Sequence, residues 1–328
     1  MKRAEGGVVL CYNITCMKKV AFIASLFGAS VAFAADSVVA KATEVGEGLG
    51  TEAEVARGGT EWFSAGFDVD LFSAYVFRNA VFNDELVLQP AVWVDLTLFD
   101  ILTVGGNVWQ NWNLTDRLKS NGVPKAMNET DYNVHVGVNI WESEDEKYSF
   151  YFMLQHDWYT YRYDFPNVNE LALRLEFNNP LVGVYGQYTQ AYHPVCACHF
   201  EVGLKQDWSV GELLESESDF LNRLSAGFDW SVNFASGRFF TNYIYGPVPG
   251  VYNPELDEYD DEAMSNGIGG TTIKGSLAYQ VCDHFTVGAV LAFTSALSGE
   301  ARDAIAYMER GGSYKDCVWG GIQVKIAF

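Results

Sequence analysis

The sequence predicts an all-β fold, an antiparallel transmembrane β-barrel of about 12 strands within a range of about 10–14. Three observations lead to this prediction. Apolar and polar residues alternate with period two in many short segments, the chain ends on such a segment closed by an aromatic residue, and an export signal precedes them. Aromatic residues make up 15% of the chain, which is typical of a barrel with aromatic girdles.

The N-terminal region has the parts of a secretory signal peptide. Met17-Lys18-Lys19 precedes an apolar run from Val20 to Ala34, which is shorter than the roughly 20 residues that span a bilayer. We expect cleavage after Ala34, and no cysteine follows there to carry a lipid anchor. The expected organisation is an extension before a misassigned start codon (1–16), the signal peptide (17–34), a flexible periplasmic leader (35–60) and the barrel (61–328). The alternative to a misassigned start codon is that the signal peptide has a genuine long n-region.

From residue 61 onward the alternation recurs, with turn residues between the runs. Successive side chains of a strand point to opposite faces, so each run has one apolar and one polar face. The expected strands cover 63–71, 88–98, 102–111, 132–141, 148–155, 170–177, 182–189, 200–207, 224–233, 273–281, 285–294 and 322–328.

The apolar faces of these runs carry no charged residue. A barrel in lipid requires this segregation, because a lipid-facing Lys or Arg costs roughly 2–4 kcal/mol at mid-bilayer. A soluble β-sandwich would show the same alternation but would tolerate charges near strand ends. Short and long connections also alternate along the chain, as periplasmic turns and extracellular loops should, provided that 238–246 belongs to an outer loop.

The last strand ends the chain on Phe328. Ile322, Val324, Ile326 and Phe328 share one face, with Gln323, Lys325 and Ala327 on the other. The segment resembles the terminal strand of bacterial outer-membrane barrels, whose last aromatic residue is read by the barrel-assembly machinery. We therefore expect these four apolar residues to act as an assembly signal; the last strand of a β-sandwich is the alternative.

The charge balance narrows the range of partners. The chain carries 21 basic and 42 acidic residues, a formal net charge of −21. Such an acidic chain is unsuited to nucleic acid, whose phosphates need Lys and Arg. No run after residue 60 approaches the length of a transmembrane helix. The expected location is the outer membrane, with membrane lipid as partner and a monomer favoured.

A local family resemblance follows the first strand. Ser73-Ala-Tyr-Val-Phe-Arg78, followed by Leu88-Gln89-Pro90 at the start of the next strand, resembles the opening of TorF-type porins. A glycine usually follows the Phe-Arg pair in that family, whereas Asn79 stands here and can also adopt a left-handed conformation. The resemblance implies a porin barrel and little specific chemistry.

Charged residues on the polar faces predict the character of the interior. A row of acids opposed by bases would create a transverse field that orients solutes and selects ions. The alternative is that these charges pair across a filled lumen. The residues expected to line the interior are Asp68, Asp70, Asp95, Glu170, Arg174, Glu176, Glu201, Lys205, Asp207, Asp229, Lys274 and Lys325.

These features predict a barrel that lets small hydrophilic solutes or ions diffuse passively, with a weak cation preference from the inward acidic excess. A twelve-stranded barrel lies between filled small barrels and open large ones. The alternative function is a closed barrel with a structural or surface-binding role through its extracellular loops, above all the loop 235–270.

Cysteines and histidines gather at His193, Cys196, Cys198 and His199. They could hold zinc or copper, but Cys-x-Cys has poor geometry for one site and no second cluster completes it, so we expect no metal and no cofactor. A disulfide from Cys196 or Cys198 to Cys317 is a further expectation, with free thiols as the alternative. Acidic runs at 142–146, 215–219 and 255–262 lack the spacing of a calcium-binding loop.

Enzymatic barrels place a serine–histidine pair at the lipid-facing rim. His156 is expected on the lipid side near the outer end of its strand, while Ser149 faces the other way, and no G-x-S-x-G motif occurs. We therefore expect no enzymatic activity, and a place for His156 in the aromatic girdle beside Trp158.

Overall fold

The computed structural model describes residues 62–99, 101–115, 129–144, 147–161, 167–245, 248–253, 258–262, 264–307 and 314–328. The predicted extension, signal peptide and leader (1–60) lie outside the described residues. Among the helices of the described part, none is both long enough and apolar enough to cross a membrane.

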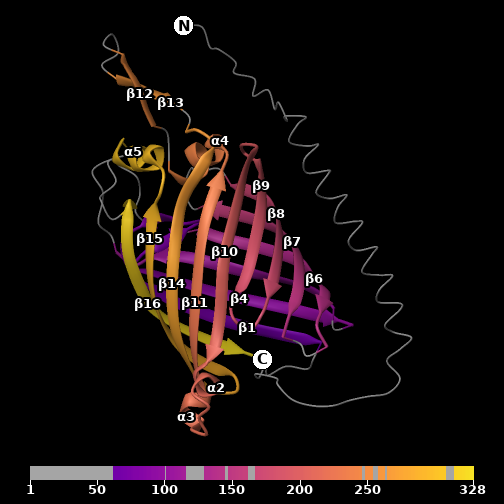
Figure 1. Ribbon diagram of the computed structural model, residues 1–328. Helices are drawn as coiled ribbons and strands as arrows, with labels where there is room; N and C mark the ends of the chain where they lie inside the picture. The colour runs from indigo at the N-terminus through magenta and orange to yellow at the C-terminus, as the bar shows by residue number, and fades with distance from the viewer. Residues whose placement is uncertain are drawn as a thin grey trace.

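Twelve antiparallel strands of the described chain close into one barrel (Figure 1), which confirms the predicted fold class. Each strand overlaps one of the alternating segments identified above. The strands are β1 (Phe63–Phe72), β4 (Val87–Leu98), β5 (Leu102–Asn113), β6 (Glu129–Glu142), β7 (Ser149–Tyr161), β8 (Val168–Asn178), β9 (Gly183–His193), β10 (Ala197–Ser209), β11 (Leu224–Ala235), β14 (Gly267–Cys282), β15 (Phe285–Ala296) and β16 (Asp316–Ala327).

The barrel closes where the first strand meets the last. β1 pairs with β4 on one side and with β16 on the other, and Phe67 lies opposite Ile326 while Asp68 lies opposite Lys325. This register keeps apolar residues beside apolar residues and polar beside polar. A slip by one residue would reverse both faces, so the alternation fixes the register.

The outer wall is apolar, and the inner wall carries polar residues away from the loop end. On β4, Val92 and Val94 are exposed on the outside, whereas Gln89 is buried. Exposure of large apolar side chains over the wall of a closed barrel is the arrangement that membrane lipid would cover.

The two ends of the barrel differ, and we call them the turn end and the loop end. The turn end holds the beginning of β1, the end of β16 and the short helices α2 (Val210–Leu213) and α3 (Asp219–Asn222) (Figure 1). The Ser209 hydroxyl caps α2 by accepting a hydrogen bond from the Glu212 N–H.

The loop end holds the long connections. They contain the hairpin β2 (Tyr75–Phe77) and β3 (Ala80–Asn83), the helices α4 (Gly237–Phe239), η1 (Phe240–Ile244) and α5 (Gly299–Tyr307), and the ribbon β12 (Val248–Asn253) and β13 (Glu258–Glu262). Because 237–244 is helical and forms no barrel strand, the prediction that this stretch belongs to a large loop is confirmed.

A hydrophobic core fills the loop end of the barrel. Side chains of the β2–β3 hairpin, α4, η1 and α5 pack there against the inner ends of the neighbouring strands. Its buried members are Phe72, Ala74, Tyr75, Ala80, Val81, Val87, Ala191, Ala197, Phe239, Phe240, Ile244, Tyr245, Met264, Val290, Ala292, Ala296, Ala301, Ala304, Ile305, Tyr314, Cys317 and Trp319. Each large side chain buried here contributes about 1.5–3 kcal/mol, so we expect this packing to hold the loops inside the barrel mouth.

Candidate functional site

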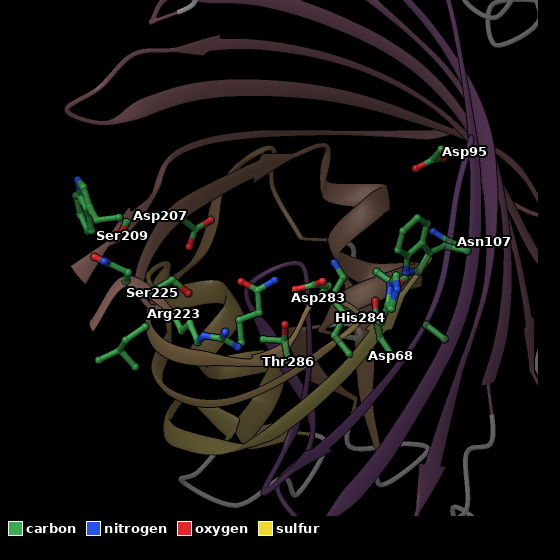
Figure 2. Close-up of a pocket in the computed structure, with 18 of the residues that line it drawn as sticks. Asp68, Asp95, Asn107, Asp207, Ser209, Arg223, Ser225, Asp283, His284 and Thr286 are labelled. Carbon is green, nitrogen blue, oxygen red and sulfur yellow. The ribbon is translucent and has the colours of Figure 1, made fainter. Parts of the chain in front are cut away.

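The lumen divides into a cavity lined by charged and aromatic side chains at the turn end and the packed core at the loop end. The cavity has a volume of about 1070 Å³. Figure 2 shows Asp68, Asp95 and Asn107 on one side of it and Asp207, Arg223 and Ser225 on the other. Water and small polar solutes suit such a space, because its wall offers carboxylate, amide, hydroxyl and guanidinium groups.

Four of the twelve predicted interior residues line this cavity: Asp68, Asp95, Asp207 and Lys325. The imidazole Nε2 of His135 lies 3.1 Å from Asp95 Oδ1. The Lys325 ammonium lies 5.4 Å from the centre of the Trp93 ring, within cation–π range. Counted over its charged lining residues, the cavity holds five acids and two bases, so it is acidic.

Most other predicted interior charges pair with neighbours along the wall. Lys274 Nζ lies 3.1 Å from Asp229 Oδ2, on directly opposed positions of β14 and β11. Glu176 accepts from both Arg174 and Lys205, and Arg174 also lies over the Tyr185 ring at 4.0 Å.

The predicted row of acids facing a row of bases across the lumen is therefore wrong. Neighbouring strands lie about 4.8 Å apart, so opposite charges on them meet more readily than charges on opposite walls. Two remaining acids are held by neutral partners: Gln323 donates to Asp70 Oδ1 at 3.2 Å, and the Tyr185 hydroxyl donates to Glu201 Oε1 at 3.0 Å.

Glu170, the last of the twelve, meets a residue that the sequence analysis did not assign to the site. Arg78 lies at the tip of the β2–β3 hairpin and binds Glu170 through both terminal nitrogens, with Nη1 at 3.1 Å from Oε1. Their side chains are 8% and 2% exposed, so the pair is closed off from solvent. Burial alone would lower the pKa of Arg78, but the Glu170 carboxylate raises it above its usual value.

The turn of the hairpin has an unusual backbone. Phe77 pairs with Ala80, which leaves Arg78 and Asn79 as a two-residue turn. Both have positive φ, 50° and 58°, as a type I′ turn requires. Asparagine tolerates this conformation, whereas arginine adopts it at a cost that surrounding contacts must offset.

Such contacts are made by both the head group and the backbone of Arg78. The guanidinium carbon lies 4.7 Å from the Phe77 ring centre and 5.0 Å from that of Phe239. Nη2 also donates to the Tyr159 hydroxyl at 3.3 Å. The Arg78 carbonyl accepts from Asn233.

Two further hydrogen bonds fix the hairpin on each side of Arg78. The Tyr75 hydroxyl donates to Glu129 Oε2 at 2.7 Å, and the Ser231 hydroxyl donates to Asn79 Oδ1 at 2.9 Å. Glu129 lies on β6 and Ser231 on β11, so the hairpin is tied to two separate parts of the wall.

The hairpin thereby crosses the lumen. It leaves the wall between β1 and β4, and in the closed order of strands β9 is six positions from β1 in either direction. Glu170 on β8 and Asn233 on β11 flank that opposite wall. The β2–β3 hairpin and the core around it therefore fill the loop end of the barrel.

Sequence reasoning missed this arrangement because it placed no strand between the first two expected barrel strands, 63–71 and 88–98, and took that stretch as a connection. A local signal was present: Tyr75, Phe77 and Val81 flank an Arg-Asn pair, and Asn favours a hairpin turn. The contact with Glu170, 92 residues away, had no signal in the sequence.

The predicted disulfide to Cys317 is also wrong. Both Cys198 and Cys317 are free thiols, so neither Cys196 nor Cys198 is joined to Cys317. The reason is the order of strands: β11, β14 and β15 stand between β10 and β16. A disulfide needs Cα atoms within about 7 Å, which is less than two strand spacings.

Among the described residues, no group of three or more His, Cys, Asp or Glu side chains is arranged to hold a metal ion. His156 lies on β7, where its ring meets Trp158 at 3.8 Å between centres and its Nε2 contacts the Tyr192 hydroxyl. His156 thus lies beside Trp158, as expected, and its place in an aromatic girdle stays a prediction.

No protein-family model matches this chain, and no curated protein matches it. Solved structures similar to it include an outer membrane channel from Pseudomonas putida F1, at 7% identity and a TM-score of 0.46 over 85% of this chain and 100% of that one. The KdgM porin is similar at 8% identity and a TM-score of 0.39, over 81% and 99% of the two chains. The translocator domain of the autotransporter NalP from Neisseria meningitidis is similar at 10% identity and a TM-score of 0.41, over 91% and 98%. At these identities and TM-scores neither a family nor a function follows, and the resemblance to TorF-type porins stays a prediction.

Proposed function

We propose that this protein is an outer-membrane channel that lets small hydrophilic solutes or ions diffuse passively, with a weak preference for cations. The observation that carries the proposal is a cavity of about 1070 Å³, with five acidic and two basic side chains in its lining, inside a barrel whose outer wall is apolar. A barrel whose only role was to hold loops would gain more stability from a filled, apolar interior than from a cavity with five acidic side chains in its lining.

The cation preference rests on the charges of the cavity. Its lining carries Asp68, Asp95, Asp207, Glu212 and Asp283 against Arg223 and Lys325. Acidic groups on a pore wall raise the local concentration of cations and lower that of anions. The excess is modest, so we propose a weak preference.

The outer membrane is part of the same proposal. The apolar outer wall would contact lipid, and the sequence supplies an expected signal peptide and an expected assembly signal in β16. The turn end would face the periplasm and the loop end the outside, because periplasmic turns of such barrels are short and extracellular loops long.

A second candidate is a closed barrel with a structural or surface-binding role through its loops. The packed core at the loop end favours it, since the β2–β3 hairpin, α4, η1 and α5 fill the mouth in this conformation. The two candidates differ in one property: whether the lumen conducts once the hairpin is out of the way.

Planar-bilayer recordings of the purified protein test this difference. We compare the wild-type chain with a variant in which residues 74–85 are replaced by two glycines, which leaves the pairing of β1 with β4 intact. The channel proposal expects rare conductance steps in the wild type and frequent steps in the hairpin-deleted variant. In asymmetric salt, the reversal potential should be shifted towards the equilibrium potential of the cation. Silence of both variants at high copy number would reject the channel and favour the closed barrel.

A further inference from the structure

We infer that the β2–β3 hairpin is a movable gate of this channel, and that the Arg78–Glu170 ion pair is the latch that holds it closed. The inference rests on the proposed function, because a gate has meaning only in a barrel that conducts. It assigns to Arg78 and Glu170 a role that the channel proposal does not contain.

The first step is that polar contacts anchor the turn of the hairpin, in addition to the apolar packing of its flanking residues. Arg78 binds Glu170, Ser231 binds Asn79, Asn233 binds the Arg78 carbonyl and Tyr75 binds Glu129. When a segment moves, its polar groups can exchange these contacts for hydrogen bonds with water. Release of the turn would therefore leave its polar groups solvated.

The second step is that the ion pair controls the equilibrium between the closed and the open position of the hairpin. A paired Arg78 and Glu170 are tolerated in the buried site, whereas either one alone would be a buried charge without a partner. When the hairpin swings out, both groups return to water. Removing one partner therefore penalises the closed state and leaves the open state nearly unchanged.

The third step is that the closed turn is conformationally costly. The positive φ of Arg78 is a strained conformation for a residue with a long side chain, and the contacts around its head group must offset it. Loss of those contacts favours release of the turn, which again shifts the balance towards the open state.

The main test compares the open probability of variants in planar bilayers. Arg78→Ala and Glu170→Gln should each raise the open probability roughly tenfold, which corresponds to a small part of what breaking a buried pair can release. Because the two residues act through each other, the double variant should open no more often than either single variant. The matched control is Arg302→Ala, which removes an exposed arginine that pairs with Asp316 at the same end of the barrel.

A crosslink tests whether the position of the hairpin itself sets conduction. Asn79 and Ser231 are chosen for the crosslink because the Ser231 hydroxyl lies 2.9 Å from Asn79 Oδ1. Asn79→Cys and Ser231→Cys are introduced into the Arg78→Ala variant, in which the native cysteines are also changed to serine. A short cleavable thiol crosslinker should return this variant to the closed state, and cleavage should reopen it.

Three results would overturn the latch. These are an Arg78→Ala channel that opens like the wild type, single and double variants whose effects simply add, and a crosslinked hairpin that still conducts. If no variant conducts, including the hairpin-deleted one, the channel proposal fails separately. Hydrogen exchange of the amides of 73–83 then judges the latch: faster exchange in Arg78→Ala supports it, and unchanged exchange rejects it.

Discussion

At the scale of single residues, Gly66 and Trp93 show how tightly the inner wall is packed at the turn end. The two residues lie opposite each other on β1 and β4. A Cβ atom added at Gly66 would lie 2.4 Å from Trp93 Cζ2 and 2.6 Å from the Ile326 carbonyl oxygen. The Trp93 indole thus occupies the space that a side chain at position 66 would fill. In this position it contacts Lys325 and lines the cavity.

We predict that Gly66→Ala lowers the free energy of unfolding by about 1–3 kcal/mol, because the indole or the β16 backbone must shift. Gly186→Ala is the matched control, since its nearest neighbour would be Phe200 Cζ at 3.8 Å, an ordinary contact. Urea-dependent unfolding in detergent, followed by tryptophan fluorescence, measures both. Equal stabilities for the two variants would show that Trp93 moves aside freely.

At the scale of elements, β16 carries the closure of the barrel. It pairs with β15 and with β1, and Phe328, the residue after it, extends the contact with β1. The Phe328 N–H donates to the Ala65 carbonyl at 2.8 Å, and the Ala65 N–H donates back at 3.0 Å. The Phe328 ring stacks on His284 at 5.5 Å. Until this strand docks, β1 and β15 each present an unpaired edge.

We predict that Phe328→Ala strongly reduces the amount of protein assembled in the outer membrane while costing the folded barrel only about 1–2 kcal/mol. The substitution keeps both backbone hydrogen bonds with Ala65, so it removes the ring alone. Phe293→Ala is the control, because the Phe293 ring is also partly exposed but lies on β15, which is not the last strand along the chain. Outer-membrane yields after cell fractionation compare them; a similar loss for both would make Phe328 an ordinary packing residue.

At the scale of the whole molecule, the two walls of the barrel have opposite character. Leu291 on β15 is 67% exposed on the outside, whereas Gln323 on β16 faces inward and binds Asp70. In water such an apolar outer wall would promote aggregation, while in lipid it is the surface that the hydrocarbon requires.

We predict that Leu291→Arg lowers the stability of the barrel refolded into phospholipid bilayers by about 2–4 kcal/mol, because its guanidinium would face hydrocarbon. Gln323→Arg should change stability far less, since position 323 faces the lumen and the Asp70 carboxylate lies beside it. Denaturant titrations in bilayers measure both variants. A change within about 0.5 kcal/mol for Leu291→Arg would contradict a membrane location of this wall.

The sequence alone predicted a barrel of about 12 strands, the faces of the alternating residues in those strands and the alternation of short turns with long loops. These features are local, because the period of a strand and the chemistry of a turn depend on neighbouring residues only. The inward positions of Asp229 and Lys274, for example, follow from alternation, and the register between β11 and β14 then brings them together.

Only the tertiary structure decided which residues meet inside the barrel. Arg78 reaches Glu170 because the β2–β3 hairpin turns into the lumen and crosses to the far wall, and Cys198 stays apart from Cys317 because three strands separate their strands. Such contacts depend on the closed order of strands and on where a loop finds a buried partner. No period in the sequence encodes either, since the free energy that selects them comes from groups far apart along the chain.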